Sequence, residues 1–412
     1  MLGSKFARLA SQSAAQTLSL RAGVVGVNFV VMLGLAALLG FDTFGQLAAI
    51  WGAALVAGTV VSLGGPLVLL RLLTDGQGMR ARDILKIALL FPAFLAVVIF
   101  GVAENLWPAW PWAAILSAGV LVNTLGCLAS VMRALGSVQA SMALRDAGPQ
   151  LSLGLAAVVA GGAGAGVILL TSAAMMLLLA CTGGYLVCRQ VGISHILSSA
   201  PRPYLSVSLW GASVVGMVVA QIDLVLGGAV ISAEQLGLYA VLRRVANLVA
   251  LPVTVATWIS APSVSAAHAA GNMAGLARAS ATGSQIALVP GLALFLIGLA
   301  ALPLIPAGFA LVYAVLLLGA LGQVVLASGF TVATLCDLPR FAMGARVLMV
   351  AGYLLWFRWW GAELTVTANA LGYVGAMTLG GAALWWGIRR RLGVDTSAAV
   401  LLRAKGGQWK IS

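Results

Sequence analysis

Long apolar stretches follow one another along this chain, separated only by short polar connections. An α-helix needs about 20 residues to cross a bilayer, and each stretch is close to that length or longer. The sequence is 62% hydrophobic and 8% charged, whereas ordinary globular chains carry about 25% charged residues. A soluble domain could not bury so much apolar surface, and continuous rather than alternating apolar runs argue against a β-barrel. We therefore expect an all-α polytopic membrane protein.

The apolar stretches leave room for about twelve transmembrane helices. We predict them at residues 22–41, 44–70, 84–103, 108–132, 143–161, 165–188, 205–230, 235–261, 281–302, 306–335, 341–360 and 364–388. The predicted organisation is a cytoplasmic amphipathic lead-in at 1–21, an N-terminal six-helix bundle at 22–188, a cytoplasmic linker at 189–204, a C-terminal six-helix bundle at 205–388 and a basic cytoplasmic tail at 389–412.

Charge is distributed unevenly between the two sides of the predicted membrane. The chain has 23 Lys and Arg against 10 Asp and Glu, a net charge of +13. Most basic residues fall at the termini and in every second connection, whereas the other connections carry acids: Asp42, Glu104, Glu234 and Glu363. This positive-inside pattern predicts that both termini are cytoplasmic. It also accounts for the basic residues without a nucleic-acid partner, which would require a clustered basic patch.

The two halves of the chain show a weak internal repeat. Residues 44–51 (FGQLAAIW) and 236–243 (LGLYAVLR) each open a span after a short acidic outer turn. Residues 133–146 (RALGSVQASMALRD) likewise parallel 333–346 (ATLCDLPRFAMGAR). Six spans per half preserve orientation, so we expect parallel repeats related by an axis along the membrane normal.

Two adjacent arginines, Arg243 and Arg244, lie inside the predicted span 235–261. Each costs about 2.5–3.5 kcal/mol at a helix centre on insertion scales, so such residues usually face a partner or a watery cavity. Asp223, the acid inside the preceding span, lies at a similar depth of about 12 Å and is a candidate ion-pair partner. Asn247 shares the helix face of Arg243. Two interpretations remain open. The arginines and Asp223 form a structural clamp, or at least one arginine contacts an anionic substrate. Asp223 is either the ion-pair partner of an arginine or a site that couples transport to a proton or another cation.

Other polar residues also lie inside predicted spans. Asn28 is the strongest further candidate for substrate contact. The rest are expected to join helices through hydrogen bonds worth about 0.6 kcal/mol: Asn123, Gln221, Gln323 and Asn369. Prolines at positions 92, 252 and 290 predict kinks. The four cysteines have no CxxC spacing, and neither a Walker lysine nor a catalytic triad is present, so we expect no metal, no cofactor and no enzymatic activity.

Several segments resemble a known transporter family. NFVVMLGLAALLGFDTFGQLAAIW (28–51) with LGGPLVLLRLL (63–73) resembles the opening of O-antigen (Wzx-type) lipid-linked oligosaccharide flippases, within the multidrug/oligosaccharidyl-lipid/polysaccharide exporter superfamily. Residues 221–252 resemble the start of that family's second half, and 133–146 its segment after span four. The resemblance covers about a quarter of the chain directly. The two extra helices of peptidoglycan-precursor flippases are missing from the predicted layout, which argues against that branch.

The resemblance implies two six-helix bundles in a V-shaped transporter with a cationic vestibule. It maps the family's inward-facing charges onto Asp223 and onto Arg243 or Arg244. The expected function is a bacterial inner-membrane flippase that moves undecaprenyl-pyrophosphate-linked oligosaccharide for surface polysaccharide synthesis (O-antigen, capsule or exopolysaccharide). Expected partners are that lipid-linked glycan, membrane lipids and polysaccharide polymerase machinery. The alternative is a cation-coupled multidrug exporter of the same superfamily. A membrane polymerase or ligase is disfavoured, because every predicted outer connection is short.

Overall fold

The computed structural model describes residues 2–74, 81–191 and 207–398, and within these ranges it contains helices but no strand. Ten helices in the described ranges are long and apolar enough to cross a membrane. The expected all-α polytopic fold class is therefore confirmed, whereas the number of spans stays a prediction. The chain separates into two compact units, Met1–Gly228 with Ser232–Gly237, and Ala229–Ile231 with Leu238–Ser412. The predicted linker at 189–204 lies mostly outside the described residues, so the predicted domain boundaries also stay predictions.

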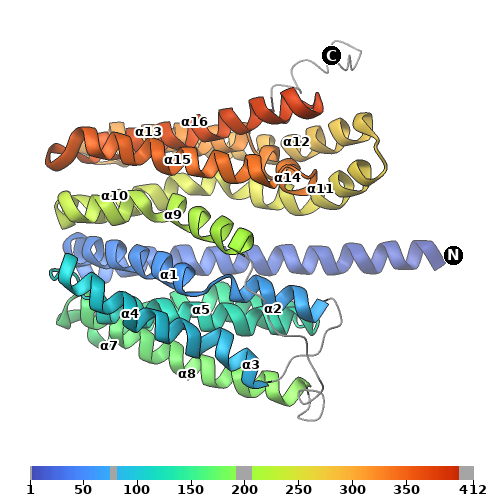
Figure 1. Cartoon of the computed structure of the whole chain (residues 1–412). Helices are drawn as coiled ribbons and strands as arrows, with labels where there is room; N and C mark the ends of the chain where they lie inside the picture. Colours follow the sequence, from blue (N-terminus) through green and yellow to red (C-terminus); the bar gives the residue numbers. More distant parts are fainter. Residues whose placement is uncertain (1, 75–80, 192–206, 399–412) are drawn as a thin grey trace. The chain divides into compact units, whose positions relative to one another are not determined.

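The first unit is built from helices of the N-terminal half together with α9 (Figure 1). In chain order these are α1 (Leu2–Val61), α2 (Gly65–Thr74), α3 (Ala81–Leu85), the π-helix η1 (Lys86–Leu90), α4 (Phe91–Leu106), α5 (Trp112–Ala134), α6 (Val138–Met142), the π-helix η2 (Ala143–Ala147), α7 (Gly148–Ala160), the 3₁₀ turn η3 (Gly161–Ala163), α8 (Ala165–Val191) and α9 (Val207–Val230).

The long element α1 consists of two helices that meet at Gly40, whose φ of 74° and ψ of 162° are not helical. Figure 1 shows α1 running away from the N-terminus and then returning. The predicted spans 22–41 and 44–70 correspond to these two arms. The second arm ends earlier than expected, because Leu63 (φ 48°) and Gly64 (φ 79°) break the helix before α2. The indole of Trp210 on α9 donates to the backbone carbonyl of Val60, 2.9 Å away, at this break.

Pro92 disturbs its helix in a specific way. It has no N–H to donate to the carbonyl of Ala88, four residues earlier. The preceding turn is wound as the π-helix η1, and the Ala88 carbonyl instead accepts from Asn123 Nδ2 (3.2 Å) and Thr124 Oγ1 (2.8 Å) on α5. The predicted kink at this proline is therefore a wider turn, and Asn123 joins two helices as expected.

The second unit contains most of α10 and the helices that follow it (Figure 1). In chain order the elements are α10 (Ala233–Asn247), the 3₁₀ turn η5 (Leu248–Ala250), α11 (Leu251–Ala269), α12 (Met273–Ala300), the 3₁₀ turns η6 (Leu302–Leu304) and η7 (Ala307–Phe309), α13 (Ala310–Val325), α14 (Ser328–Leu335), α15 (Pro339–Trp360), the 3₁₀ turn η8 (Gly361–Glu363) and α16 (Val366–Leu392).

The predicted span 235–261 is not one regular helix. Helix α10 ends at Asn247, a single 3₁₀ turn follows, and α11 begins with Pro252 in its first turn. A 3₁₀ stretch inside a helix often marks a hinge, and this one lies a few residues after the arginine pair.

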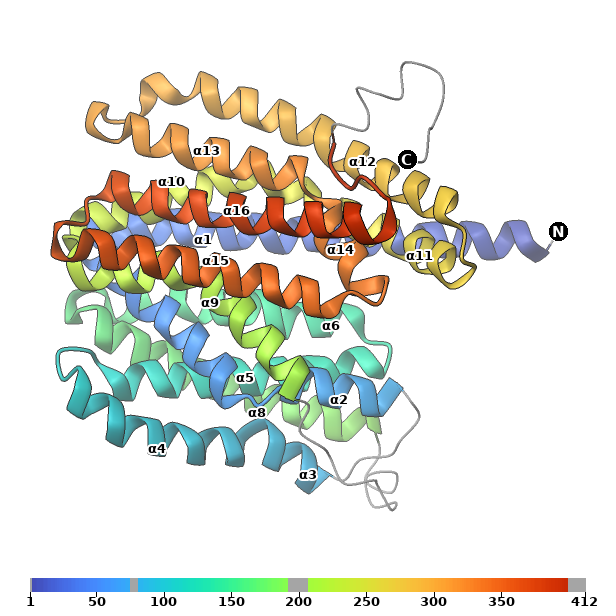
Figure 2. The same cartoon turned by 45° about the horizontal axis from the view of Figure 1, so that its top comes forward.

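Beyond α16, residues 394–398 form a strap that returns to the second unit (Figure 2). Val394, Thr396, Ser397 and Ala398 are all buried. The Ala398 amide donates to the carbonyl of Val325 at 2.8 Å, and Ser284 Oγ donates to the carbonyl of Thr396 at 3.3 Å. The strap thus ties α12 and α13 to the end of α16.

Candidate functional site

Arg243 is held by an aromatic side chain of the second unit. The arginine lies in α10 and is 7% exposed. Its Nη2 donates to the hydroxyl of Tyr373 on α16 at 3.1 Å, and its Cζ lies 4.6 Å from the centre of the same ring. A desolvated cation–π contact contributes about 2 kcal/mol, which offsets part of the cost of burying the charge. Arg243 is therefore fixed in position within the second unit.

A second polar contact on α16 reaches a third helix. Asn369 lies one helical turn before Tyr373 on α16 and is fully buried. Its Oδ1 accepts a short hydrogen bond from the hydroxyl of Tyr353 on α15. Asn369 thus joins α15 to α16, in agreement with the helix-joining role expected for intramembrane amides.

Arg244 is presented differently from its neighbour. Consecutive helical residues point about 100° apart, and Arg244 is half-buried where Arg243 is buried. Asn247 closes α10, is also half-buried, and makes no capping hydrogen bond with its side chain. Of the two arginines, Arg244 has the larger exposed fraction.

Asp223 lies on α9 in the first unit, and its side chain is fully buried. A buried carboxylate at this depth in an apolar helix is costly unless it is paired. Its predicted pairing with Arg243 or Arg244 stays a prediction, as does its predicted role in cation coupling.

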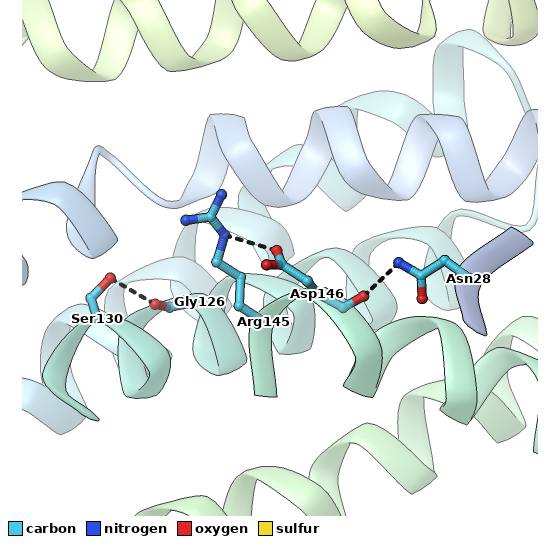
Figure 3. Close-up of polar contacts among 5 residues, drawn as sticks. All are labelled: Asn28, Gly126, Ser130, Arg145 and Asp146. Carbon is cyan, nitrogen blue, oxygen red and sulfur yellow. Dashed lines mark hydrogen bonds and ion pairs between the residues drawn. The ribbon is translucent and has the colours of Figure 1, made fainter. Parts of the chain in front are cut away.

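Asn28 lies in the first arm of α1 and binds the backbone of a distant helix (Figure 3). Its Nδ2 donates to the carbonyl of Asp146 at 3.0 Å. Asp146 belongs to the π-helix η2, which leads into α7. The Oδ1 of Asn28 is buried and accepts no hydrogen bond from the part of the chain that the structure describes. Asn28 therefore joins two helices and keeps one acceptor available.

Two arginines related by the internal repeat lie in helices, inside the predicted spans 143–161 and 341–360. Arg145 is in η2, and its Nε lies 3.3 Å from Asp146 Oδ1 (Figure 3). Arg346 is in α15, with its Cζ 5.2 Å from the ring centre of Phe330. The two arginines have different neighbours, an acid for Arg145 and an aromatic ring for Arg346.

The contact between Tyr373 and Arg243 was not predicted from the sequence. Nothing in the spacing along the chain links Tyr373 to Arg243, which lies 130 residues earlier. One available signal was its position one turn after Asn369 on the same face of a helix.

No protein-family model and no curated protein matches this chain. Several solved structures do match over nearly its whole length. A structure of the lipid II flippase MurJ in an inward closed conformation has a TM-score of 0.67 at 10% identity, covering 96% of this chain and 94% of that chain. An inward-facing multidrug resistance MATE family transporter of the MOP superfamily has a TM-score of 0.63 at 12% identity, covering 90% and 94%.

The Vibrio cholerae MATE transporter VcmN in its bent form also matches, with a TM-score of 0.53 at 14% identity, covering 92% of this chain and 98% of that one. The chain shares the fold of these transporters. The ten long apolar helices of the described ranges make it a multi-pass membrane protein by length and composition. Identities of 10–14% show the fold and leave the substrate open. Proteins with this fold include a lipid II flippase and multidrug transporters. Membership of the Wzx-type family stays a prediction.

Proposed function

We propose that this chain is a flippase for polyprenyl-pyrophosphate-linked oligosaccharide in the bacterial inner membrane, with both termini in the cytoplasm. The observation that carries the proposal is the arginine pair in α10, where Arg243 is anchored on Tyr373 and Arg244 is left half-buried beside it. A fixed cation inside an apolar span favours an anionic substrate group over a cationic one. The fold that this chain shares with a lipid II flippase supports a lipid-linked substrate.

The two arginines have different roles in this proposal. Arg243 is a positioning residue, because its guanidinium is occupied by the ring and hydroxyl of Tyr373. Arg244 binds the pyrophosphate or an acidic sugar, since a guanidinium offers two parallel N–H donors to such an anion. Asn247 and Asn28 are proposed as further polar contacts for the glycan head.

Transport would follow an alternating-access cycle in which the two units move relative to each other. In this cycle the 3₁₀ turn Leu248–Ala250 would be the hinge at which α10 changes its angle to α11. The driving force is an ion gradient or removal of the product by polysaccharide polymerase machinery on the outer face.

The proposal is tested by depleting the protein in its native host and assaying lipid-linked glycan on each face of the inner membrane. We expect the glycan to accumulate on the cytoplasmic face while surface polysaccharide is lost. Arg244→Ala should reproduce this phenotype at normal protein levels. Arg358→Ala is the matched control, because Arg358 is exposed in the last turn of α15. Unchanged glycan distribution on depletion would refute the function, and normal export by Arg244→Ala would refute the site.

The second candidate function is a cation-coupled multidrug exporter. It is favoured by the buried acid Asp223, a group able to exchange a proton, and by the shared fold with MATE transporters. A cationic pair in α10 is a poor environment for cationic drugs, which places this function second. New sensitivity to small toxic cations in depleted cells, with normal glycan export, would reverse the order.

A further inference from the structure

A cavity of about 490 Å³ lies within the second unit. Its walls are formed by α11, α13, α14, α15 and α16, and its volume falls within the roughly 300–1,000 Å³ that small-molecule sites occupy. Most of the wall is apolar. Five of the lining side chains carry polar atoms: Thr257, Gln323, Thr331, Thr334 and Thr378.

These polar side chains differ in whether their hydrogen bonds are satisfied. Thr331 Oγ1 donates to Thr257 Oγ1 at 3.2 Å, and Thr334 Oγ1 donates to the carbonyl of Phe330 at 2.7 Å. Gln323 and Thr378 bind no side chain or backbone group of the described residues. An amide inside an apolar helix with no partner is costly, because neither lipid nor apolar side chains can replace water. Gln323 is half-buried and Thr378 is exposed, so the cavity presents one amide and one hydroxyl to an occupant able to hydrogen-bond.

The charge around the cavity limits what that occupant can be. None of the described residues that line it is acidic or basic. Phe330, which does line it, carries the guanidinium of Arg346 on its ring. A cation is therefore disfavoured, and an anion would have no charged donor in the wall. An apolar chain would leave the Gln323 amide unsatisfied. A neutral group that both donates and accepts hydrogen bonds is the class that fits.

We propose that this cavity binds an uncharged sugar ring. A sugar presents hydroxyl groups that match the Gln323 amide and the Thr378 hydroxyl, and C–H faces that pack against Phe330 and Met377. The inference rests on the proposed flippase function for the identity of its ligand, a sugar of the lipid-linked glycan. It assigns Gln323 a substrate contact in place of the helix-joining role that its position in an apolar span first indicated.

The test uses the full chain in lipid nanodiscs and two photoreactive probes. One is a short isoprenyl phosphate linked to glucose, with a diazirine on the sugar. The other is the same isoprenyl phosphate without sugar, with a diazirine near its phosphate. Cross-linked peptides are mapped by mass spectrometry. We expect the sugar probe to label residues 319–335 and 377–384, and the sugar-free probe to leave them unlabelled.

The decisive variant is Gln323→Leu, which removes the amide at nearly constant volume. We expect labelling of the cavity to fall about threefold to tenfold, the effect of one lost neutral hydrogen bond. Gln221→Leu is the matched control, because Gln221 is an intramembrane glutamine of the first unit that does not line the cavity. Thr378→Val is a second variant in case the first does not fold. A merely structural glutamine would lower thermal stability when replaced, whereas an unpartnered one would not.

Two results would overturn the inference: equal labelling of wild type and Gln323→Leu, or labelling by the sugar-free probe as strong as that by the sugar probe. Translocation of a fluorescent lipid-linked glycan is measured in proteoliposomes with the same preparations. Translocation without cavity labelling refutes the cavity and leaves the flippase standing. Cavity labelling without translocation supports the sugar site and refutes the flippase.

Discussion

The backbones of Gly45 and Gly237 approach each other so closely that neither position has room for a side chain. A Cβ on Gly45 would overlap the carbonyl oxygen of Ala233, and a Cβ on Gly237 would overlap the carbonyl oxygen of Phe41. The two glycines also occupy equivalent places in the internal repeat. The start of α10 and the second arm of α1 therefore cross symmetrically, each repeat copy using the same positions against the other.

Replacing Gly237 with Val should disrupt this crossing. The overlapping atom is a backbone carbonyl, which cannot turn away as a flexible side chain does. We expect destabilisation of about 1–3 kcal/mol or more, seen as a lower thermal midpoint in a fluorescence-detected unfolding assay. Gly101→Ala is the control, because a Cβ at Gly101 meets no atom within 4 Å. A Gly237→Val protein as stable as Gly101→Ala would show that the helices separate readily here.

Tyr373→Phe should loosen Arg243 without removing the ring beneath it. The lost hydrogen bond predicts destabilisation of about 0.6 kcal/mol, the average for side-chain pairs inside membranes, and no more than about 1.7 kcal/mol. Tyr373→Leu removes the ring as well and should cost more. Thermal unfolding of both variants in the same detergent gives the order. If Tyr373→Leu is no less stable than Tyr373→Phe, the cation–π contact contributes nothing.

The strap after α16 should weaken in acid. Burial alone would raise the pKa of Asp395, but hydrogen bonds from Trp385 and Ser397 and the charge of Arg389 lower that pKa overall. A lowered pKa means that the carboxylate stabilises the folded state above the unfolded pKa of about 3.9, and that this stabilisation is lost as pH falls through the folded pKa.

Asp395→Asn should therefore lower the thermal midpoint at neutral pH, and its difference from wild type should shrink as the pH falls below about 4. Asp42→Asn provides the control for an exposed carboxyl group. A difference that stays constant from pH 7 down to acid unfolding would mean that the charge of Asp395 is irrelevant to the strap.

The four cysteines should fall into two classes of reactivity. Cys127 and Cys336 are buried, and Cys181 and Cys188 are exposed. Burial and the neighbouring carboxylate of Asp337 also raise the pKa of Cys336, which lowers its reactive thiolate fraction. Intact mass after N-ethylmaleimide, with the protein in detergent, should show at most two adducts in folded protein and four after denaturation, because Cys181 lies inside an apolar span. Adducts on Cys127 or Cys336 in the folded protein would contradict the packing around them.

Hydropathy and charge were sufficient to predict the fold class, since length and composition decide whether a helix can lie in a membrane. The same reasoning missed the local winding. The π-helix before Pro92 and the 3₁₀ turn before Pro252 depend on which carbonyls lose their donor and on what lies nearby to replace it. For Ala88 the replacement comes from α5, a contact between residues distant in the sequence.

The candidate site was predictable only in part. A charge inside an apolar run identifies Arg243 and Arg244, because burying charge is costly wherever it occurs. The roles of the two arginines depend on Tyr373, which the sequence does not connect to them. For Gln323 the residue type alone is not informative, since an intramembrane amide fits both helix joining and substrate contact. Its place in the wall of the cavity is what supports the proposal of substrate contact.

The strap has a consequence for the order of biogenesis. Helices α12 and α13 leave the ribosome well before residues 394–398, yet Ser284 and Val325 receive partners from that later segment. The second unit can therefore insert all of its helices while one end of the bundle still lacks its final hydrogen bonds. Maturation of this unit would end when the strap docks after membrane insertion. A chain stalled before the strap would have its helices inserted, but Ser284 and Val325 would lack their hydrogen-bond partners.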